Sequence, residues 1–171
     1  MPEGAGAPWH RWLALSAAVA AADLATKAWV SAAFEPGDVH VVTPFLNLVL
    51  WHNPGAAFSF LAGAGGWQRW FFIVLTLAIG AALLVMLRRA GTNRLLATAL
   101  SLVLGGAAGN LWDRVTLGHV VDFVQLHAGG YYWPAFNVAD SAITLGVVLL
   151  LLDGFREART ARGAGARPGE R

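Results

Sequence analysis

Residues 70–87 read WFFIVLTLAIGAALLVML, an apolar run without a single Asp, Glu, Lys or Arg. At about 1.5 Å per residue in a helix, this run reaches roughly 27 Å, close to the thickness of the hydrocarbon core of a bilayer. The length and composition of the run therefore predict a transmembrane helix.

Three further apolar runs of similar length follow the same pattern: residues 12–34, 95–112 and 134–152. The last is interrupted only by Asp140, and the first contains Asp23 and Lys27. The first run has a rival interpretation as a signal peptide, because His10 and Arg11 precede it. We favour a spanning helix, because the apolar run resumes after Lys27. The fold class predicted is an all-α membrane bundle of four helices.

The composition agrees with a membrane protein of one domain. Of 171 residues, 57% are hydrophobic and 13% are charged, whereas soluble domains carry about 25% charged residues. A pI of about 9.7 raises the possibility of a nucleic-acid partner. We reject that partner, because the basic residues form short clusters between apolar runs, as topology signals do. There is no cysteine, which excludes disulfides, thiol catalysis and zinc held by cysteine.

The basic residues predict the orientation in the membrane. Most of them fall on one side if both termini are cytoplasmic: Arg11, Arg88, Arg89, Arg94, Arg156, Arg159, Arg162, Arg167 and Arg171. The opposite side has only Arg69 and Arg114. The ends are rich in Gly, Ala, Pro and charge, so we expect disordered cytoplasmic tails at 1–11 and 154–171 around a membrane domain at 12–153.

The segments between the spans on the outer side read as short strands. Residues 39–43, 45–51 and 119–127 are rich in β-branched and aromatic residues. Asn53-Pro54-Gly55 is a strong turn signal. These segments predict a small extracytoplasmic β-platform at the membrane surface.

Ionisable residues within the spans cost a few kcal/mol or more each, and proteins keep them where they act or pair. In the predicted topology nearly all of them converge on the outer leaflet, and only Asp23 lies near mid-span. Asp122 and Asp140 are the candidate catalytic pair. Two close carboxylates share one proton, so one can activate water while the other donates to a carbonyl. The alternative is two unrelated residues, one capping a helix and one in a loop.

Other polar residues have a functional and a structural interpretation. Asn137 and Asp140 share a helix face at a spacing of three, so Asn137 either orients the carboxylate or caps the helix. Asp113 and Arg114 could form a surface pair or belong to the site. Asp23 and Lys27, four apart, predict an ion pair inside the membrane.

Two further patterns concern packing and rival chemistry. Gly105 and Gly109 have the GxxxG spacing, which indicates close helix packing. The HExxH and GxSxG motifs are absent. Ser59 with His52, or His119 with Asp122 as metal ligands, would be weak alternatives, so we expect no metal and no cofactor.

Taken in order, five motifs resemble the lipoprotein signal peptidases (signal peptidase II). They are DLATK at 23–27, HNPGAAFS at 52–59, GGAAGNLWDR at 105–114, VVDF at 120–123 and FNVADS at 136–141. Each motif is weak alone, but the ordered set on four spans is specific. The resemblance covers about residues 12–153.

The resemblance implies an aspartic endopeptidase that cuts a bacterial prolipoprotein before a diacylglyceryl-modified Cys. It implies Asp122 and Asp140 as the catalytic dyad and these residues as substrate-binding or supporting: Asn53, Gly55, Asn110, Asp113, Arg114, Asn137, Asp23 and Lys27. Residues 45–60 would form a lid or cradle. We expect a monomer in the lipid of the bacterial inner membrane, with its site at the outer leaflet.

Two other functions fit four short helices with buried carboxylates. A small proton-coupled transporter would place its charges near mid-membrane and work as a dimer, whereas only Asp23 is central here. A nonenzymatic scaffold gives no reason for the placement of Asp122 and Asp140.

Overall fold

The structure, a computed structural model, describes residues 8–55 and 65–165. Its helices are a short 3-10 helix η1 (Trp9–Arg11), α1 (Trp12–Ala33), α2 (Trp67–Arg89), α3 (Arg94–Thr116) and α4 (Val138–Gly165). Its strands are β1 (Val39–Thr43), β2 (Leu46–Asn53), β3 (Val120–Ala128) and β4 (Tyr131–Tyr132). Four of the described helices are long and apolar enough to cross a membrane. The predicted all-α membrane fold with a small β-platform is therefore confirmed.

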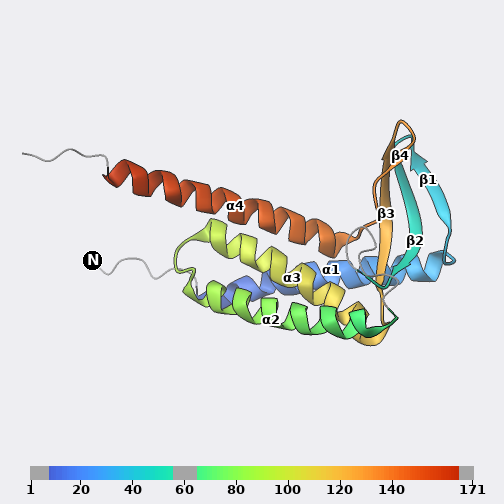
Figure 1. The fold of residues 1–171 in the computed structure, drawn as a ribbon, viewed down its shortest axis with the longest axis horizontal. Helices are drawn as coiled ribbons and strands as arrows, with labels where there is room; N and C mark the ends of the chain where they lie inside the picture. The colour runs from blue at the N-terminus through green and yellow to red at the C-terminus, as the bar shows by residue number, and fades with distance from the viewer. Residues whose placement is uncertain (1–7, 56–64, 166–171) are drawn as a thin grey trace, which may run out of the picture.

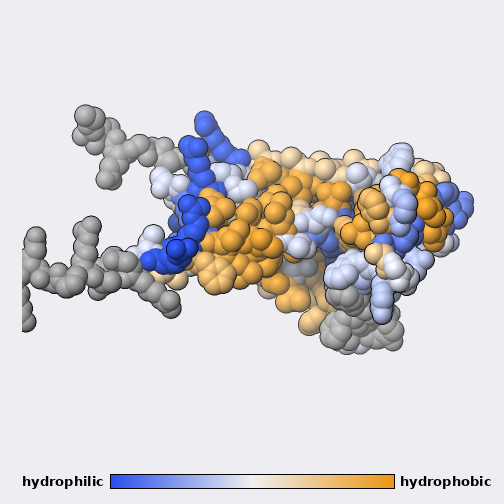
Figure 2. Space-filling view, turned by 90° about the horizontal axis from the view of Figure 1, so that it is seen from above, coloured by the Kyte–Doolittle hydropathy of each residue, from blue (hydrophilic) through white to orange (hydrophobic). Residues whose placement is uncertain are grey.

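The helices lie side by side, and the sheet stands across one end of the bundle (Figure 1). The start of η1 and the end of α4 lie at the other end of the bundle (Figure 1). Figure 2 shows a broad hydrophobic belt over the helices, between a hydrophilic cluster at the end with the termini and a mixed surface at the sheet end. We call these two ends the terminal end and the sheet end.

The structure departs from several predicted boundaries. Trp9–Arg11 form η1 within the tail expected to be disordered, and α3 runs to Thr116 rather than 112. α4 begins at Val138 rather than at 134, because residue Phe136 pairs with strand β3 before the helix starts. The tail expected from residue 154 is helical as far as Gly165. Arg156, Glu157 and Ala158 are strong helix formers, which explains why the helix continues. Residues 1–7 and 166–171 of the expected tails lie outside the described residues.

Helix α3 is the centre of the bundle, and its glycines allow the close contacts. A Cβ on Gly105 would meet the carbonyl oxygen of Ser16 on α1 at 2.6 Å. A Cβ on Gly106 would meet the carbonyl oxygen of Ala139 on α4. A Cβ on Gly109 would collide with the Asp23 carboxylate on α1, so the packing role predicted for the GxxxG spacing is confirmed at both of its glycines.

Strand β3 lies inside the sheet, whose strand order is β1-β2-β3-β4 with antiparallel pairs throughout. Its residues Val120 to Phe123 are all buried. The register of β2 against β3 shifts between Leu48 and Trp51, which is a bulge that re-aims the following side chains. On the other side, the Phe136 carbonyl accepts from the N–H groups of Phe123 and Val124. β3 is thus held between β2 and the entrance to α4.

Two apolar clusters hold the bundle and attach the sheet. At the terminal end the core contains Leu83, Leu87, Ala90, Ala97, Leu100 and Val103. At the sheet end, Val30 of α1 packs with Leu50, Val121 and Phe123 of the strands. The second cluster fixes the sheet on the helix ends, and the polar residues described next lie beside it.

Candidate active site

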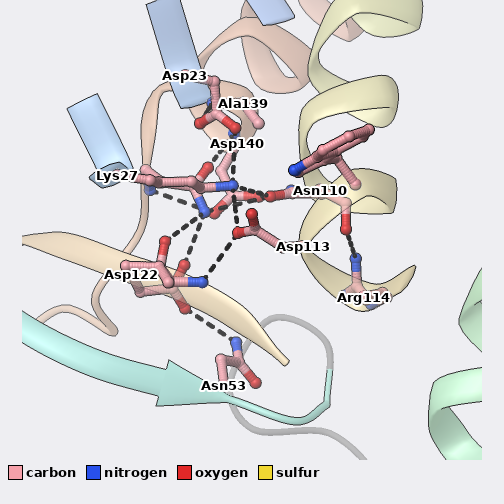
Figure 3. A network of polar contacts seen from close by, with 12 residues as sticks. Asp23, Lys27, Asn53, Asn110, Asp113, Arg114, Asp122, Ala139 and Asp140 are labelled. Carbon is pink, nitrogen blue, oxygen red and sulfur yellow. Dashed lines mark hydrogen bonds and ion pairs between the residues drawn. The ribbon is translucent and has the colours of Figure 1, made fainter. Parts of the chain in front are cut away.

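Polar side chains from α1, β2, α3, β3 and α4 meet where the sheet joins the helices (Figure 3). Asp23, Lys27, Asp113, Asp122 and Asn137 are each at most 3% exposed. Burying charged groups in this way is favourable only when they are paired or hydrogen-bonded. The ion pairs and hydrogen bonds of this cluster therefore decide how its side chains are arranged.

Asn137 connects the two carboxylates that the sequence singles out. Its side-chain Nδ2 donates to Asp122 Oδ1 at 2.8 Å, and its backbone N–H donates to Asp140 Oδ2 at 3.3 Å. Its Oδ1 also accepts from the backbone N–H of Asp140 at 2.9 Å. Asn137 therefore caps α4 with its side-chain oxygen, and it contacts the Asp122 carboxylate through its side chain and the Asp140 carboxylate through its backbone N–H.

Two more amides complete the surroundings of these carboxylates. Asn53, at the end of β2, donates from Nδ2 to Asp122 Oδ2 at 3.0 Å. Asn110, on α3, donates from Nδ2 to Asp140 Oδ1 at 2.8 Å. Each carboxylate thus accepts hydrogen bonds at both of its oxygens, and neither is free to rotate.

Lys27 holds the deeper part of the cluster. Its Nζ lies 2.7 Å from Asp23 Oδ2 and 2.9 Å from Asp113 Oδ2. It also donates to Asn110 Oδ1 at 2.9 Å. Because this contact occupies the Asn110 oxygen, the Asn110 nitrogen is turned toward Asp140. The ion pair predicted between Asp23 and Lys27 is present and extends to α3.

Asp23 also fixes the start of α4. Its Oδ1 accepts from the backbone N–H of Ala139 at 2.8 Å, in the first turn of that helix. A carboxylate at a helix N-terminus satisfies a free donor and interacts favourably with the helix dipole. Asp23 thus supports Asp140 through the backbone rather than by direct contact.

Arg114 does not pair with Asp113, contrary to the surface pair considered from sequence. Its Nη2 donates to the carbonyl oxygen of Gly55 at 2.9 Å, and its guanidinium lies over the Phe72 ring at 5.0 Å. The Gly55 N–H in turn donates to Asn53 Oδ1 at 3.0 Å. Arg114 therefore holds the turn after β2 by a hydrogen bond. Asp113 instead pairs with Lys27 and accepts a hydrogen bond from the N–H of Val121.

The electrostatics of Asp122 differ from those of an ordinary aspartate. Burial, together with the nearby charge of Asp140, raises the pKa of Asp122 from 3.8 to about 7, although the amides of Asn53 and Asn137 act in the opposite direction. A carboxyl with a pKa near 7 can hold a proton at neutral pH and give it up during a reaction. The pair can therefore carry one proton between two carboxyl groups.

Asp122 lines two cavities, and Asp140 lines one of them. One, of about 700 Å³, is lined by Asp122 and Asp140 and by apolar α4 residues that include Ile143, Leu145 and Val148. The other, of about 680 Å³, lies on the sheet side and includes Asp122, Trp51 and Tyr132. An extended or helical peptide can thus approach the carboxylates from the helix side and continue over the sheet.

The structure places the two histidines of the minor alternatives beside each other. The His52 ring stacks on the His119 ring, with centroids 4.1 Å apart. Ser59 and residues 56–60 of the expected lid lie outside the described residues. Sequence reasoning missed Arg69, which donates to carbonyl oxygens at the end of α3. The available signal was its positive charge on the outer side.

The comparisons with known proteins agree with one another. Residues 15–156 match the family described as signal peptidase (SPase) II. A lipoprotein signal peptidase of Paraburkholderia phymatum is 49% identical over 158 residues, covering 92% of this chain and 95% of that protein. One from Burkholderia mallei is 52% identical over 161 residues, covering 93% of this chain and 94% of that protein.

The fold has close counterparts among solved structures. A bacterial membrane enzyme determined by the in meso method at 2.3 Å resolution superposes with a TM-score of 0.80 at 32% identity, covering 95% of this chain and 94% of that one. A second, at 1.9 Å resolution, gives a TM-score of 0.74 at 36% identity, covering 84% of this chain and 92% of that one. With its buried polar cluster and its four membrane helices, this chain belongs to the signal peptidase II family of aspartic peptidases, multi-pass proteins of the bacterial inner membrane.

Proposed function

We propose that this protein removes the signal peptide from diacylglyceryl-modified prolipoproteins and cuts the bond before the lipidated Cys. Membership of the signal peptidase II family supports this activity, as do relatives named lipoprotein signal peptidase. The same membership argues against the transporter and scaffold alternatives.

Asp122 and Asp140 are the proposed catalytic residues. The observation that carries this assignment is the position of Asn137, which contacts Asp122 Oδ1 at 2.8 Å and Asp140 Oδ2 at 3.3 Å. A single residue that contacts both carboxyl groups keeps them close to one another at the cavity wall. Two close carboxyl groups with one shared proton are the arrangement that aspartic peptidases use.

In the proposed reaction, Asp140 takes a proton from a water molecule as the water oxygen attacks the scissile carbonyl carbon. Asp122, which holds the shared proton because its pKa is raised to about 7, donates to the carbonyl oxygen. The tetrahedral intermediate then collapses, the C–N bond breaks, and the amide nitrogen takes a proton from the dyad. The products are a signal peptide with a free carboxyl group and a mature protein with a free Cys amine.

The remaining polar residues would support the dyad. Asn53, Asn110 and Asn137 donate to its carboxyl oxygens. Lys27 and Asp113 fix Asn110 and the Val121 backbone. These residues are proposed to set the geometry of the dyad and to keep the surrounding charge balanced. Arg114 and Gly55 would hold the turn after β2, which borders the cavities.

The surroundings support a site at the outer leaflet that opens sideways to lipid. The cavity wall on α4 contains Leu145 and Val148, which are more than 40% exposed on the hydrophobic belt. The basic residues gather at the terminal end, which supports a cytoplasmic location for both termini. The polar cluster is hydrogen-bonded within this chain, and we propose that a monomer surrounded by membrane lipid is active. We also propose that no nucleic acid is bound, because the basic residues follow the membrane topology.

Cleavage by the purified protein in detergent tests this function. We expect a diacylglyceryl-modified prolipoprotein to be cut and the same protein without its diacylglyceryl group to be left intact. EDTA should leave the rate unchanged, because the proposed reaction uses no metal. Cleavage that needs an added metal, or that ignores the lipid modification, would contradict the proposal.

A further inference from the structure

Arg69 lies in the first turn of α2, at the sheet end, where topology gives no reason for a positive charge. Its Nε donates to the carbonyl oxygen of Arg114 at 2.8 Å, and its Nη2 donates to that of Val115 at 2.8 Å. Both acceptors belong to the last turn of α3. The side chain thus joins the start of one helix to the end of another.

The contact supplies hydrogen-bond donors to carbonyl groups in the last turn of α3. The last carbonyl groups of a helix lack partners within the helix and carry its negative dipole end. Here the Asp113 carbonyl accepts from the N–H groups of Leu117 at 2.7 Å and Gly118 at 3.2 Å. Arg69 serves the next two carbonyls along the chain, and its rigid fork of donors holds both at once.

The chain then turns directly against the Arg69 side chain. Gly118 has φ +85°, and a Cβ there would lie 3.5 Å from the Arg69 Nη1. Asp122 follows only four positions later. Asp113, just before the turn, accepts from the Val121 N–H at 3.1 Å through its Oδ2. The turn from α3 to β3 is therefore fixed from inside by Asp113 and from outside by Arg69.

We propose that Arg69 is a positioning residue for the peptidase reaction, which fastens the α3–β3 turn from α2 and so holds Asp122 at its place opposite Asp140. The inference rests on the proposed function, since it assigns Arg69 a role only through that dyad. Arg69 does not touch the carboxyl groups. It acts through the backbone of residues 114–118 and through β3.

A merely structural anchor and a positioning residue predict different results. An anchor would lower the melting temperature and leave the properties of the dyad unchanged. Replacing a positioning residue would also change the pH dependence of kcat. If Asp122 moves away from Asp140 and toward water, it loses the burial and the neighbouring charge that raise its pKa. The alkaline limb of the kcat profile would then shift to lower pH.

The test compares Arg69→Ala and Arg69→Lys with the wild-type full chain in detergent, using a diacylglyceryl-modified prolipoprotein. Arg89→Ala, an exposed arginine at the other end of the same helix, is the matched control. For Arg69→Ala we expect kcat to fall by about 10- to 100-fold, the scale of small misplacements in active sites. KM should change by less than about twofold, because the substrate is not contacted. Arg69→Lys should be intermediate, and Arg89→Ala should match wild type.

A wild-type kcat and pH profile in both Arg69 variants would overturn the inference, whatever happens to the melting temperature. If Arg69→Ala does not purify in folded form, Arg69→Lys decides alone by the same criteria. Asp122→Asn in the same assay separates the two proposals. If the wild type does not cut, the proposed function fails. If the wild type cuts and Asp122→Asn stays active, the dyad assignment fails, and the role of Arg69 fails with it. An inactive Asp122→Asn beside wild-type behaviour of both Arg69 variants refutes the present inference only.

Discussion

Lys27 is the only lysine in the chain, and its ammonium group has three donors for three acceptors. It lies 2.7 Å from Asp23 and 2.9 Å from both Asp113 and Asn110. Without this cation, two buried carboxylates would face each other across α1 and α3. Lys27 is therefore the residue on which the charge balance of the cluster depends most.

We expect Lys27→Met to lower the free energy of unfolding by about 3–5 kcal/mol, the cost of breaking a buried ion pair from one side. Thermal or denaturant unfolding in detergent measures it. Adding Asp23→Asn should recover part of the loss, because one uncompensated charge is removed. An unchanged stability of Lys27→Met would show that the ammonium does not neutralise these carboxylates.

The raised pKa of Asp122 predicts the pH dependence of activity. With the pKa at about 7, the dyad loses its shared proton as the pH rises through that value. We therefore expect kcat/KM to fall on the alkaline side with a midpoint near pH 7, because no proton is left for the carbonyl oxygen. A rate that stays constant up to pH 9 would contradict this protonation scheme.

The same shift predicts a pH dependence of stability. A carboxyl whose pKa is higher in the folded state than in the unfolded chain stabilises the fold fully below about pH 4, and this contribution is lost as the pH rises through about 7. Asp122→Asn removes the ionisation. Its melting temperature should therefore exceed that of wild type at pH 8 and approach it toward pH 4, as unfolding scans can check.

At this scale the sequence predicted which residues gather but not how they connect. Asp140 stood out because it interrupts an apolar run. The contact from Asn53 to Asp122 depends on the bulge in β2, which periodicity does not reveal. The side chains of Asp113 and Arg114 leave the end of α3 in different directions and have different partners. Their adjacency in the sequence does not reveal this.

At the scale of the elements, α3 decides the arrangement, because its glycines let α1 and α4 approach. A Cβ at Gly109 would collide with the Asp23 carboxylate. A Cβ at Gly146 on α4 would meet the Ala99 carbonyl oxygen at 2.8 Å. The small residues thus set the helix spacing on which the polar contacts depend.

We expect Gly109→Ala to lower the free energy of unfolding by about 1–3 kcal/mol, the range for overpacking a tight contact. Peptidase activity should fall with it, because Asp23 must move. Gly154→Ala is the matched control on α4, since nothing lies within 4 Å of its Cβ position. If both variants are equally stable, α1 and α3 are not packed as closely as described.

The positions of the helices could be predicted from the sequence, because a helix that crosses the hydrocarbon core of a bilayer needs a long apolar run. The four spans match the described helices to within a few residues, except around α4. That helix starts late because Phe136 joins the sheet, and it ends late because its polar residues also favour helix. Hydropathy marks where lipid contact ends and not where a helix ends.

At the scale of the whole molecule, a hydrophobic belt separates the mixed surface of the sheet end from the hydrophilic cluster of the terminal end (Figure 2). The proposed dyad belongs to the sheet end. The sheet could be predicted only as separate strands. β2 pairs with β3 although α2 and α3 lie between them in the chain. Such pairing depends on the helices returning to the same end of the bundle, which local patterns do not specify.

The orientation can be tested because the chain has no native cysteine. Tyr131→Cys, at a position 85% exposed at the sheet end, should react with a membrane-impermeant maleimide in intact spheroplasts. Glu157→Cys, exposed near the end of α4, should react only after the membrane is opened. The reverse pattern would place the site on the cytoplasmic side and contradict the proposed orientation.

The central claim is that Asp122 and Asp140 act together, and the most direct test is the cleavage rate of the two single variants. With a diacylglyceryl-modified prolipoprotein, Asp122→Asn and Asp140→Asn should each lower kcat by at least about 10²-fold, the lower bound for loss of a general acid or base. Asp38→Asn, half-exposed on the same side and outside the cluster, should cut like wild type. If either dyad variant folds and keeps most of its activity, the two carboxyl groups are not the catalytic pair.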